Sequence, residues 1–500
     1  MTALPGDSGM WLYFKTLTFI TMFVTYLFFW FTLILCTTNA FFLFNANDNA
    51  CPASCECVTI FNLQEVDCHG LTSVPSGIPS NTRILDLRLC DLTSVHVDQL
   101  INVTDLQMFT FREALNDEEF YNLTTLQLQN LFQINIVDSP LSSVPQLLPS
   151  YIIELSLVNT SLKTLRSGSF QNYQKLKMIT LWNCQLVHIE SGAFDDLPAL
   201  ISLDLHDNNL VDDSFSPHMF RENRVLQSVT LNSNKLTHVV SNLPDSLTDV
   251  DYYNNSITTL QAWAFKFTPN LTTIGLQQNN IKTIQDYAFD GLLKAKEVDL
   301  SHNEINTVSN YSFSGLTGVT KLNIRDNNIK NLEKEAFSPF MSLRELIIDD
   351  NQIAAIEDFT FQAMASLVTI DLTNNKLVQI TNNTFTGLHS LQEMDITGNV
   401  IQNIEPEAFI SLKSLRFLRI INNRLERLQP EVLNNVPAGT TVYLGGLNPW
   451  KCDCHLRWLR EAVDNATYHI QYPNAMRCAT PMKLAGKYFS DLNPSDFVCT

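Results

Sequence analysis

Apolar residues recur along this chain with a period of 24. In the stretch LTTIGLQQNNIKTIQDYAFDGLLK, residues 271–294, they occupy positions 1, 4, 6, 11, 14, 19 and 22. Positions 4 and 6 point the same way because side chains alternate along a strand. The pattern predicts a repeated unit with one short strand at positions 3 to 5. Each strand would lie parallel to its neighbours, about 4.8 Å away.

The register continues without insertion over eight consecutive units. They begin at Leu247, Leu271, Ala295, Val319, Leu343, Leu367, Leu391 and Leu415. Upstream, the spacing is 24 from Leu176 to Leu200, then 26 to Leu226 and 21 to Leu247. Residues 100–150 align ambiguously, and we expect distorted repeats there. A stack of repeats is one continuous body, so 500 residues need not divide into several domains.

Position 9 of the unit is usually asparagine. It is found at Asn208, Asn234, Asn255, Asn279, Asn303, Asn327, Asn351, Asn375, Asn399 and Asn423. An amide carries donors and acceptors, so it can serve backbone groups where the chain leaves the strand. Cys90 and Cys184 take the same position about four units apart, roughly 19 Å, which is too far for a disulfide. Buried structural thiols are favoured over a redox role.

These repeats resemble the extracellular leucine-rich repeat family, in the type with phenylalanine at position 19, here Phe289. That family includes Slit, the variable lymphocyte receptors and the ectodomains of Toll-like receptors, and the resemblance covers about residues 51–499. It implies an α/β solenoid, a curved horseshoe with a parallel β-sheet on its concave side. We expect about 15 repeats over residues 81–447.

Two cysteine clusters resemble the caps of this family. CPASCEC at 51–57 with Cys68 predicts an N-terminal cap over residues 51–80, and NPWKCDC at 448–454 predicts a C-terminal cap over residues 448–500. The family's pairing implies four disulfides: Cys51–Cys57, Cys55–Cys68, Cys452–Cys478 and Cys454–Cys499. Spacing alone allows three pairings within each set of four. Zinc is the alternative, which an oxidising compartment disfavours. One extra residue before Asn448 leaves the join of the last strand to the cap open.

The N-terminus predicts export from the cytosol. Residues 16–36 carry no charge, and Thr38 and Ala40 are the small residues of a cleavage site after Ala40. We therefore expect residues 1–40 to be a signal peptide. The uncharged segment is also about as long as a membrane-spanning helix. Retention as an N-terminal anchor is the alternative, and only then would the protein contact a membrane.

Eight glycosylation sequons agree with this compartment, and several glycans are expected. The sequons are Asn102, Asn122, Asn159, Asn254, Asn270, Asn310, Asn382 and Asn465.

The formal charge of −19 argues against a nucleic-acid partner. It is either a solubility feature or an acidic face for a basic partner. No catalytic or nucleotide-binding motif is found, so neither an enzyme nor a cofactor is expected. His206 and His302 lie four units apart and cannot share a metal ion, and we expect no metal site.

Positions 2, 3, 5, 7 and 8 are not needed for the core, so they are free to bind a ligand. Position 5 forms an acidic row that ends in a basic residue: Asp204, Thr230, Asp251, Gly275, Asp299, Asn323, Ile347, Asp371, Asp395 and Arg419. A solvated face is the simpler interpretation of this row. The candidate binding residues are Ile347, the aromatic Trp182 and Tyr253, and the basic and apolar cluster Arg416, Phe417, Arg419 and Ile421.

The predicted function is recognition of an extracellular protein or glycan through the concave face of a secreted solenoid. From Thr272 to Asn422 the ligand-facing positions hold no sequon, so the C-terminal half is the larger open surface. One alternative is a membrane-anchored receptor or adhesion protein held by residues 16–36. Another is a structural matrix protein like the small leucine-rich proteoglycans, against which the NPWKCDC cap counts. The ligand, and whether the chain forms a homodimer, stay open.

Overall fold

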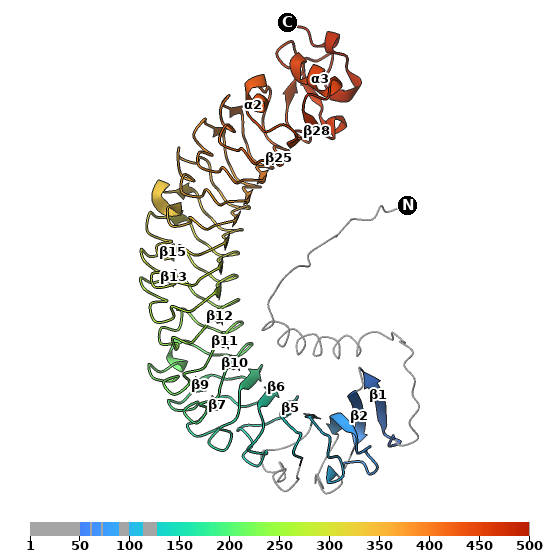
Figure 1. Cartoon of the computed structure of the whole chain (residues 1–500), viewed down its shortest axis with the longest axis vertical. Helices are drawn as coiled ribbons and strands as arrows, with labels where there is room; N and C mark the ends of the chain where they lie inside the picture. The colour runs from blue at the N-terminus through green and yellow to red at the C-terminus, as the bar shows by residue number, and fades with distance from the viewer. Residues whose placement is uncertain (1–50, 61–62, 72–73, 90–99, 114–127, 500) are drawn as a thin grey trace.

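The computed structural model describes residues 51–60, 63–71, 74–89, 100–113 and 128–499, and these form a curved solenoid (Figure 1). A 19-stranded sheet lines its concave side. The N-terminal strands are β1 (Cys55–Ile60), β2 (Leu63–Leu71), β3 (Thr82–Leu89), β4 (Met108–Arg112), β5 (Gln133–Val137), β6 (Glu154–Val158) and β8 (Met178–Trp182). The predicted leucine-rich repeat horseshoe is confirmed.

The sheet continues through three-residue strands. They are β10 (Ser202–Asp204), β11 (Ser228–Thr230), β12 (Asp249–Asp251), β14 (Thr273–Gly275), β16 (Glu297–Asp299), β18 (Lys321–Asn323), β20 (Glu345–Ile347), β21 (Thr369–Asp371), β23 (Glu393–Asp395), β25 (Phe417–Arg419), β26 (Thr441–Tyr443) and β28 (His469–Gln471). Only the β1–β2 pair of this sheet is antiparallel among the described strands.

Short strand pairs and helices complete the turns and the cap. On the convex side the pairs are β7 (Thr164–Leu165) with β9 (His188–Ile189), β13 (Thr259–Leu260) with β15 (Thr283–Ile284), β17 (Thr307–Val308) with β19 (Asn331–Leu332), and β22 (Gln379–Ile380) with β24 (Asn403–Ile404). The C-terminal cap holds the pair β27 (Trp450–Lys451) and β29 (Cys478–Thr480). The helices are η3 (Asp212–Ser214), η4 (Lys334–Phe337), α2 (Pro430–Asn434), α3 (Arg457–Asp464), η5 (Pro473–Ala475), η6 (Phe489–Asp491) and η7 (Pro494–Asp496).

Strand pairing reproduces the sequence register. From Asp251 to Arg419 each position-5 residue lies opposite the one 24 residues later. In the region where distorted repeats were expected, β4, β5 and β6 pair over five residues without a shift. These strands start at residues 108, 133 and 154, so the repeats are 25 and 21 residues long instead of 24. Residues 114–127 lie outside the described residues.

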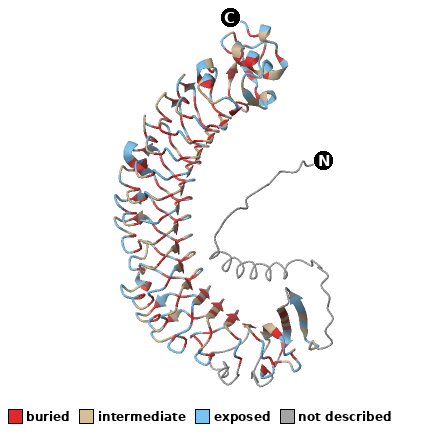
Figure 2. Cartoon of the chain, viewed as in Figure 1, coloured by how far each residue is buried: buried red, intermediate tan, exposed pale blue. Residues whose placement is uncertain are grey.

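The core is one continuous file of apolar side chains between the concave and convex sides (Figure 2). The position-4 and position-6 side chains Ile274 and Leu276 are fully buried, as is Phe289 at position 19. Phe289 stacks between its equivalents in the neighbouring units, at centroid distances of 5.7 Å to Phe265 and 6.2 Å to Phe313. Burying each such side chain contributes about 1.5–3 kcal/mol.

The position-9 asparagines form a ladder of buried amides. Asn303 Nδ2 donates to three backbone carbonyls at 2.9–3.2 Å, those of Leu276, Leu300 and Ser301. Its Oδ1 accepts the backbone N–H of Ile281 at 3.0 Å. Each amide thus ties its own turn to the preceding one and satisfies groups that water cannot reach.

Asn448 extends this ladder into the C-terminal cap. Its Oδ1 accepts the backbone N–H groups of Asn423 and Leu425 at 3.1 and 3.2 Å, and its Nδ2 donates to the Ile420 carbonyl at 2.9 Å. The extra residue before Asn448 is absorbed in a turn that includes Gly446, at φ 76°. The sheet therefore runs without a break through β26 into β28 of the cap.

The eight cap cysteines are joined as the family resemblance implies. The disulfides link Cys51 to Cys57, Cys55 to Cys68, Cys452 to Cys478 and Cys454 to Cys499. Cys184 is a buried free thiol that donates to the Leu157 carbonyl at 3.2 Å, and burial raises its pKa to about 11. A thiol in that state is a packing group rather than a nucleophile. Cys90 lies outside the described residues.

Replacing Asn351 by alanine should lower the free energy of unfolding by about 1–3 kcal/mol, because buried backbone groups lose their partners. Asn351 Nδ2 donates to the carbonyls of Ile324, Ile348 and Asp349. Asn328 is a matched control, since it is exposed on the adjoining loop. Denaturant unfolding of Asn351→Ala and Asn328→Ala checks this, and equal midpoints would contradict the role of the ladder.

Candidate functional site

The concave face presents the side chains at positions 3 and 5 of each strand. In β14, as in its neighbours, the central residue is buried and the two flanking residues are half-buried. Parallel pairing therefore aligns like positions into rows that cross the whole sheet. The fold supplies a rigid surface on which single positions vary without disturbing the core.

The acidic position-5 row has a structural role that the sequence did not reveal. Asp251, Asp299 and Asp371 each accept, through Oδ1, the backbone N–H of the residue two places later at 2.9 Å. This local bond caps the point where the chain leaves the strand. Aspartate at position 5 is thus explained by the turn alone, and the acidity of the row is no evidence for a basic ligand.

Phe417 and Arg419 lie in β25, at the C-terminal end of the face. The Arg419 guanidinium lies 5.7 Å from the Phe417 ring centroid and 5.3 Å from that of Tyr443 in β26. The Tyr443 ring in turn lies 6.3 Å from that of Tyr472, which the cap contributes. We call Phe417, Arg419, Tyr443 and Tyr472 the C-terminal aromatic cluster.

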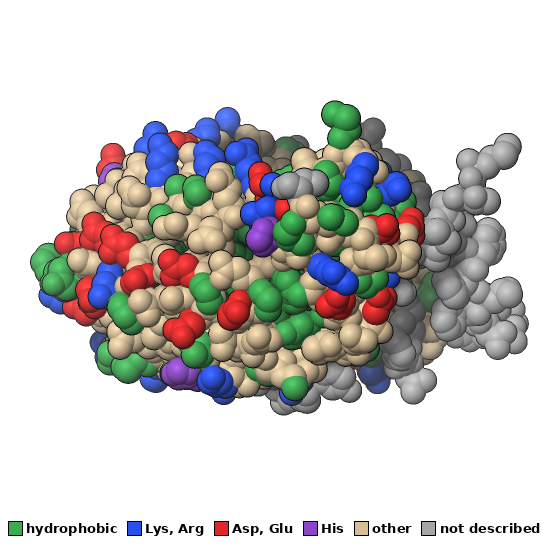
Figure 3. All heavy atoms as spheres, turned by 90° about the horizontal axis from the view of Figure 1, so that it is seen from above, with side chains coloured by type: hydrophobic (Ala, Val, Ile, Leu, Met, Phe, Trp, Pro, Cys, Tyr) green, Lys and Arg blue, Asp and Glu red, His purple; other side chains and the backbone are tan. Residues whose placement is uncertain are grey.

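Two carboxylates orient the guanidinium of this cluster. Arg419 lies 3.7 Å from a Glu393 oxygen and 3.9 Å from an Asp395 oxygen. All three side chains are partly exposed, so the ion pairs contribute little to stability. The two ion pairs orient the Arg419 guanidinium over the rings of Phe417 and Tyr443. On the end of the molecule that Figure 3 shows, acidic side chains likewise lie among basic and apolar ones.

The other predicted residues of the C-terminal half are spread out. Ile421 is half-buried at the strand exit beside the turn at Gly446. Arg416 is exposed on the flank where β25 begins. Ile347 lies in β20, three strands before Arg419, between Asn323 and Asp371 of the neighbouring strands. The cluster and Ile347 therefore share one face without touching.

Trp182 and Tyr253 do not form a joint site. Trp182 stacks on His206 at a centroid distance of 4.9 Å, and its Nε1 donates to Asp207 Oδ2 at 2.8 Å. Tyr253 is half-buried just after β12, three strands further along the sheet. Trp182 is therefore packed against a neighbouring side chain.

Tyr443 and Tyr472 are binding candidates that the sequence reading missed. Tyr443 is the position-5 residue that follows Arg419 by 24, and the two lie opposite each other in the sheet. Extending the 24-residue register by one unit beyond Arg419 would have identified Tyr443. Tyr472 follows β28 and is largely exposed in a left-handed backbone conformation. Tyr472 lies in the C-terminal cap, so the 24-residue spacing of the repeats could not have identified it.

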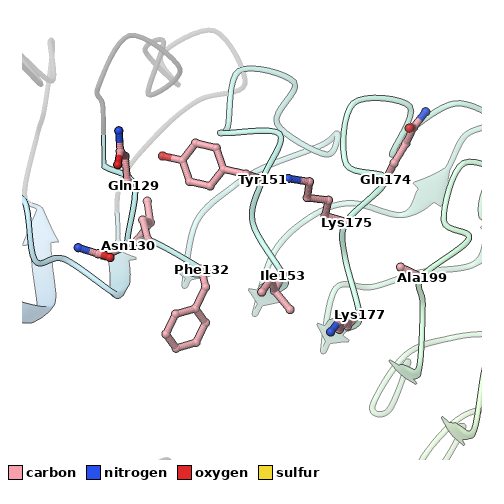
Figure 4. Close-up of a pocket in the computed structure, with 10 residues that line it drawn as sticks. Gln129, Asn130, Phe132, Tyr151, Ile153, Gln174, Lys175, Lys177 and Ala199 are labelled. Atoms are coloured by element: carbon pink, nitrogen blue, oxygen red, sulfur yellow. The ribbon is translucent and has the colours of Figure 1, made fainter.

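A surface hollow of about 660 Å³ lies on the flank of the N-terminal turns rather than on the concave face. Figure 4 shows its lining, with Lys175 pointing toward Tyr151 and Phe132 and Ile153 nearby. The Tyr151 hydroxyl is occupied, since it donates to the Leu128 carbonyl at 2.8 Å.

The sequons that the structure describes all lie at the surface, exposed or half-buried. Exposed asparagines are Asn102, Asn159, Asn254 and Asn465, and half-buried ones are Asn270, Asn310 and Asn382. Asn122 lies outside the described residues. Glycosylation of these positions stays a prediction.

Asp349, on the concave face, should make stability depend on pH. Burial, and then repulsion from Asp371 and Asp350, raises the pKa of this carboxyl to about 7, although Arg325 Nε lies 3.3 Å from its Oδ2. Between pH 4 and 7 the folded chain then binds more protons than the unfolded chain, so stability falls as pH rises. Asp349→Asn should flatten that slope and raise the melting temperature at pH 8. Melting curves from pH 4 to 8 check this, and parallel slopes for both proteins would contradict it.

Comparison with known proteins agrees with this architecture. A family model described as leucine rich repeat matches residues 151–210, 174–236, 245–305, 294–353 and 341–401. These residues contain leucine-rich repeats, and the described chain has the leucine-rich repeat fold. Mouse podocan is 27% identical to it over 231 residues, which are 44% of this chain and 32% of podocan. The match thus spans about a third of the length of the curated relatives compared.

Solved structures share the fold. A chain of the Drosophila Toll–Spatzle complex has a TM-score of 0.66, with 18% identity over 89% of this protein and 76% of that chain. A chain of the octameric complex of latrophilin 3, Unc5D and the leucine-rich repeat part of FLRT2 has a TM-score of 0.51. It is 25% identical and covers 59% of this chain and 90% of that chain.

The compartment follows from the relatives and the disulfides. The sequence relatives are small leucine-rich proteoglycans of the extracellular matrix. Four disulfides also require an oxidising environment. The protein is therefore extracellular. Among the described residues no helix has the length and apolar composition needed to cross a bilayer, and residues 16–36 lie outside them.

Proposed function

We propose that this protein recognises an extracellular protein through the C-terminal half of its concave face. The observation that carries the proposal is the C-terminal aromatic cluster, in which Arg419 is held across the rings of Phe417 and Tyr443. Arginine and tyrosine are enriched among residues that dominate binding energy, above all where they are already oriented. Ile347 adds an apolar contact further along the face.

A protein ligand is favoured over a glycan by the mixture of chemistry on this face. Aromatic rings, a guanidinium, carboxylates and an isoleucine together resemble the centre of a protein interface. The similar chain in the latrophilin 3–Unc5D–FLRT2 complex belongs to an assembly of extracellular proteins, which supports the same class of partner here.

A structural role in the extracellular matrix is the second candidate, and the similarity to podocan favours it. Extraction separates the two roles. A matrix component would stay with insoluble material that needs denaturant for release, whereas a recognition protein would be recovered in the culture medium. Recovery with intact cells only would instead support a membrane-anchored receptor or adhesion protein.

The proposal is tested by capture with a matched variant. The purified protein and its Phe417→Ala/Arg419→Ala variant are immobilised, incubated with extracellular material and washed. Proteins retained by the first and lost by the second are ligands of the concave face. Equal recovery on both surfaces would overturn the proposal.

A further inference from the structure

Three aromatic side chains stand exposed in one column on the convex side. Trp263, Tyr287 and Tyr311 occupy position 17 of successive units and are 55%, 39% and 52% exposed. Trp263 N–H donates to the Tyr287 carbonyl at 3.0 Å and Tyr287 N–H to the Tyr311 carbonyl at 3.1 Å. The two tyrosine rings stack at 5.4 Å. We call this column, in the turns after β13, β15 and β17, the convex aromatic stripe (Figure 1 labels β13 and β15).

The backbone at this position does not favour aromatic residues. Trp263 and Tyr287 have φ of 58° and 64°, in the left-handed region. In two earlier units the same position is glycine, Gly168 and Gly192, also with positive φ. A side chain in that conformation costs roughly 1–2 kcal/mol relative to glycine. Strained residues that the fold does not need point to a function.

A glycosylation sequon adjoins the stripe. Asn310 directly precedes Tyr311, and its Oδ1 accepts the Glu335 N–H at 3.1 Å while its own backbone N–H donates to Glu333 at 2.9 Å. The amide is thus anchored to the following turn. Its nitrogen, the atom that carries an N-linked sugar, makes no hydrogen bond among the described residues.

We propose that Asn310 carries an N-linked glycan whose first sugars pack along the convex aromatic stripe. The C–H faces of pyranose rings are apolar, and tyrosine and tryptophan offer a large apolar surface with a polar edge. Contact with the sugars would cover apolar surface that is otherwise open to water and to other protein molecules. Packing of the glycan would explain why aromatic residues occupy positions with a strained backbone. The glycan lies on the opposite side of the solenoid from the proposed ligand.

Asn382 provides an internal comparison. It also occupies position 16, and its Oδ1 accepts the Glu407 N–H at 2.8 Å. Its neighbour at position 17 is Asn383, and the nearest aromatic ring of that column, Phe359, already has the Lys334 ammonium 5.3 Å above its centroid. A glycan on Asn382 therefore has no free aromatic stripe and should stay mobile.

The experiment measures how well each glycan is protected. The full chain is expressed through a secretory pathway, and glycan release by an endoglycosidase from the native protein is followed at each site by mass spectrometry. Release at Asn310 should be at least several-fold slower than at Asn382. In Trp263→Gly/Tyr287→Gly the difference between the two rates should become smaller, while the melting temperature is unchanged or higher because glycine suits positive φ.

A second measurement separates packing from simple crowding. With isotope-labelled sugars, the N-acetyl resonances that Asn310→Gln removes should be displaced by ring currents, and the double glycine variant should shift them toward the Asn382 values. The proposal is overturned if secreted protein carries no sugar at Asn310. It is also overturned if release rates and resonances are the same in the parent and the glycine variant.

Discussion

Replacing Ile347, Phe417 and Arg419 together by alanine is expected to abolish binding to the extracellular partner. Truncating a central interface anchor costs about 2 kcal/mol or more, roughly 30-fold in Kd for each. Arg419 should behave as such an anchor because Phe417, Tyr443, Glu393 and Asp395 orient it before binding. Surface plasmon resonance with the captured partner measures the loss, and circular dichroism shows that the variant is folded.

A matched control comes from the other half of the same face. Ser202 and Ser228 are half-buried position-3 residues of β10 and β11. Their replacement by alanine changes the concave surface without touching the cluster, and affinity should stay within a few-fold. Undiminished binding by the first variant would move the site elsewhere, first to the face around Trp182 and Tyr253.

The fold could be predicted from sequence because the repeat encodes its own geometry. A side chain at position 4 or 6 must be apolar in every unit, and position 9 usually carries an amide, so the period is visible without any contact being known. Even the units of 26 and 21 residues pair as the leucines indicate, since Asp204, Thr230 and Asp251 lie side by side. Variation in length is absorbed on the convex side, where only some of the described turns form strand pairs.

The candidate site could be predicted only in part, because it depends on contacts between units. Phe417 and Arg419 stood out as unlike their neighbours, but nothing in their spacing showed that Arg419 pairs with Glu393 and lies over Tyr443. A solvated face is the simpler interpretation of the row of aspartates, but composition did not reveal the structural role of these residues. The structure shows those carboxylates accepting hydrogen bonds from their own turns. A residue therefore points to a function only when the fold does not require that residue type at its position.

Removing the Cys452–Cys478 disulfide should lower stability strongly. The bond closes a segment of 26 residues in sequence, and loop-closure entropy of that length corresponds to roughly 3–4 kcal/mol. Both cysteines are buried beside Trp450, and the disulfide ties β27 to β29 in the cap that covers the open end of the core. Cys452→Ser/Cys478→Ser should therefore expose the last turn and lower the midpoint of denaturant unfolding.

The double substitution avoids a stray thiol, so its effect reports the missing crosslink. Cys184→Ser is the control, because Cys184 is equally buried but unpaired and a serine hydroxyl can also donate to the Leu157 carbonyl. Its midpoint should shift much less. Because a solenoid unfolds by nearest-neighbour steps, the cap variant should lose its C-terminal turns first, which hydrogen exchange can resolve. Free thiols at Cys452 and Cys478 in the secreted protein, or equal midpoints for the two variants, would contradict a cap that seals the core.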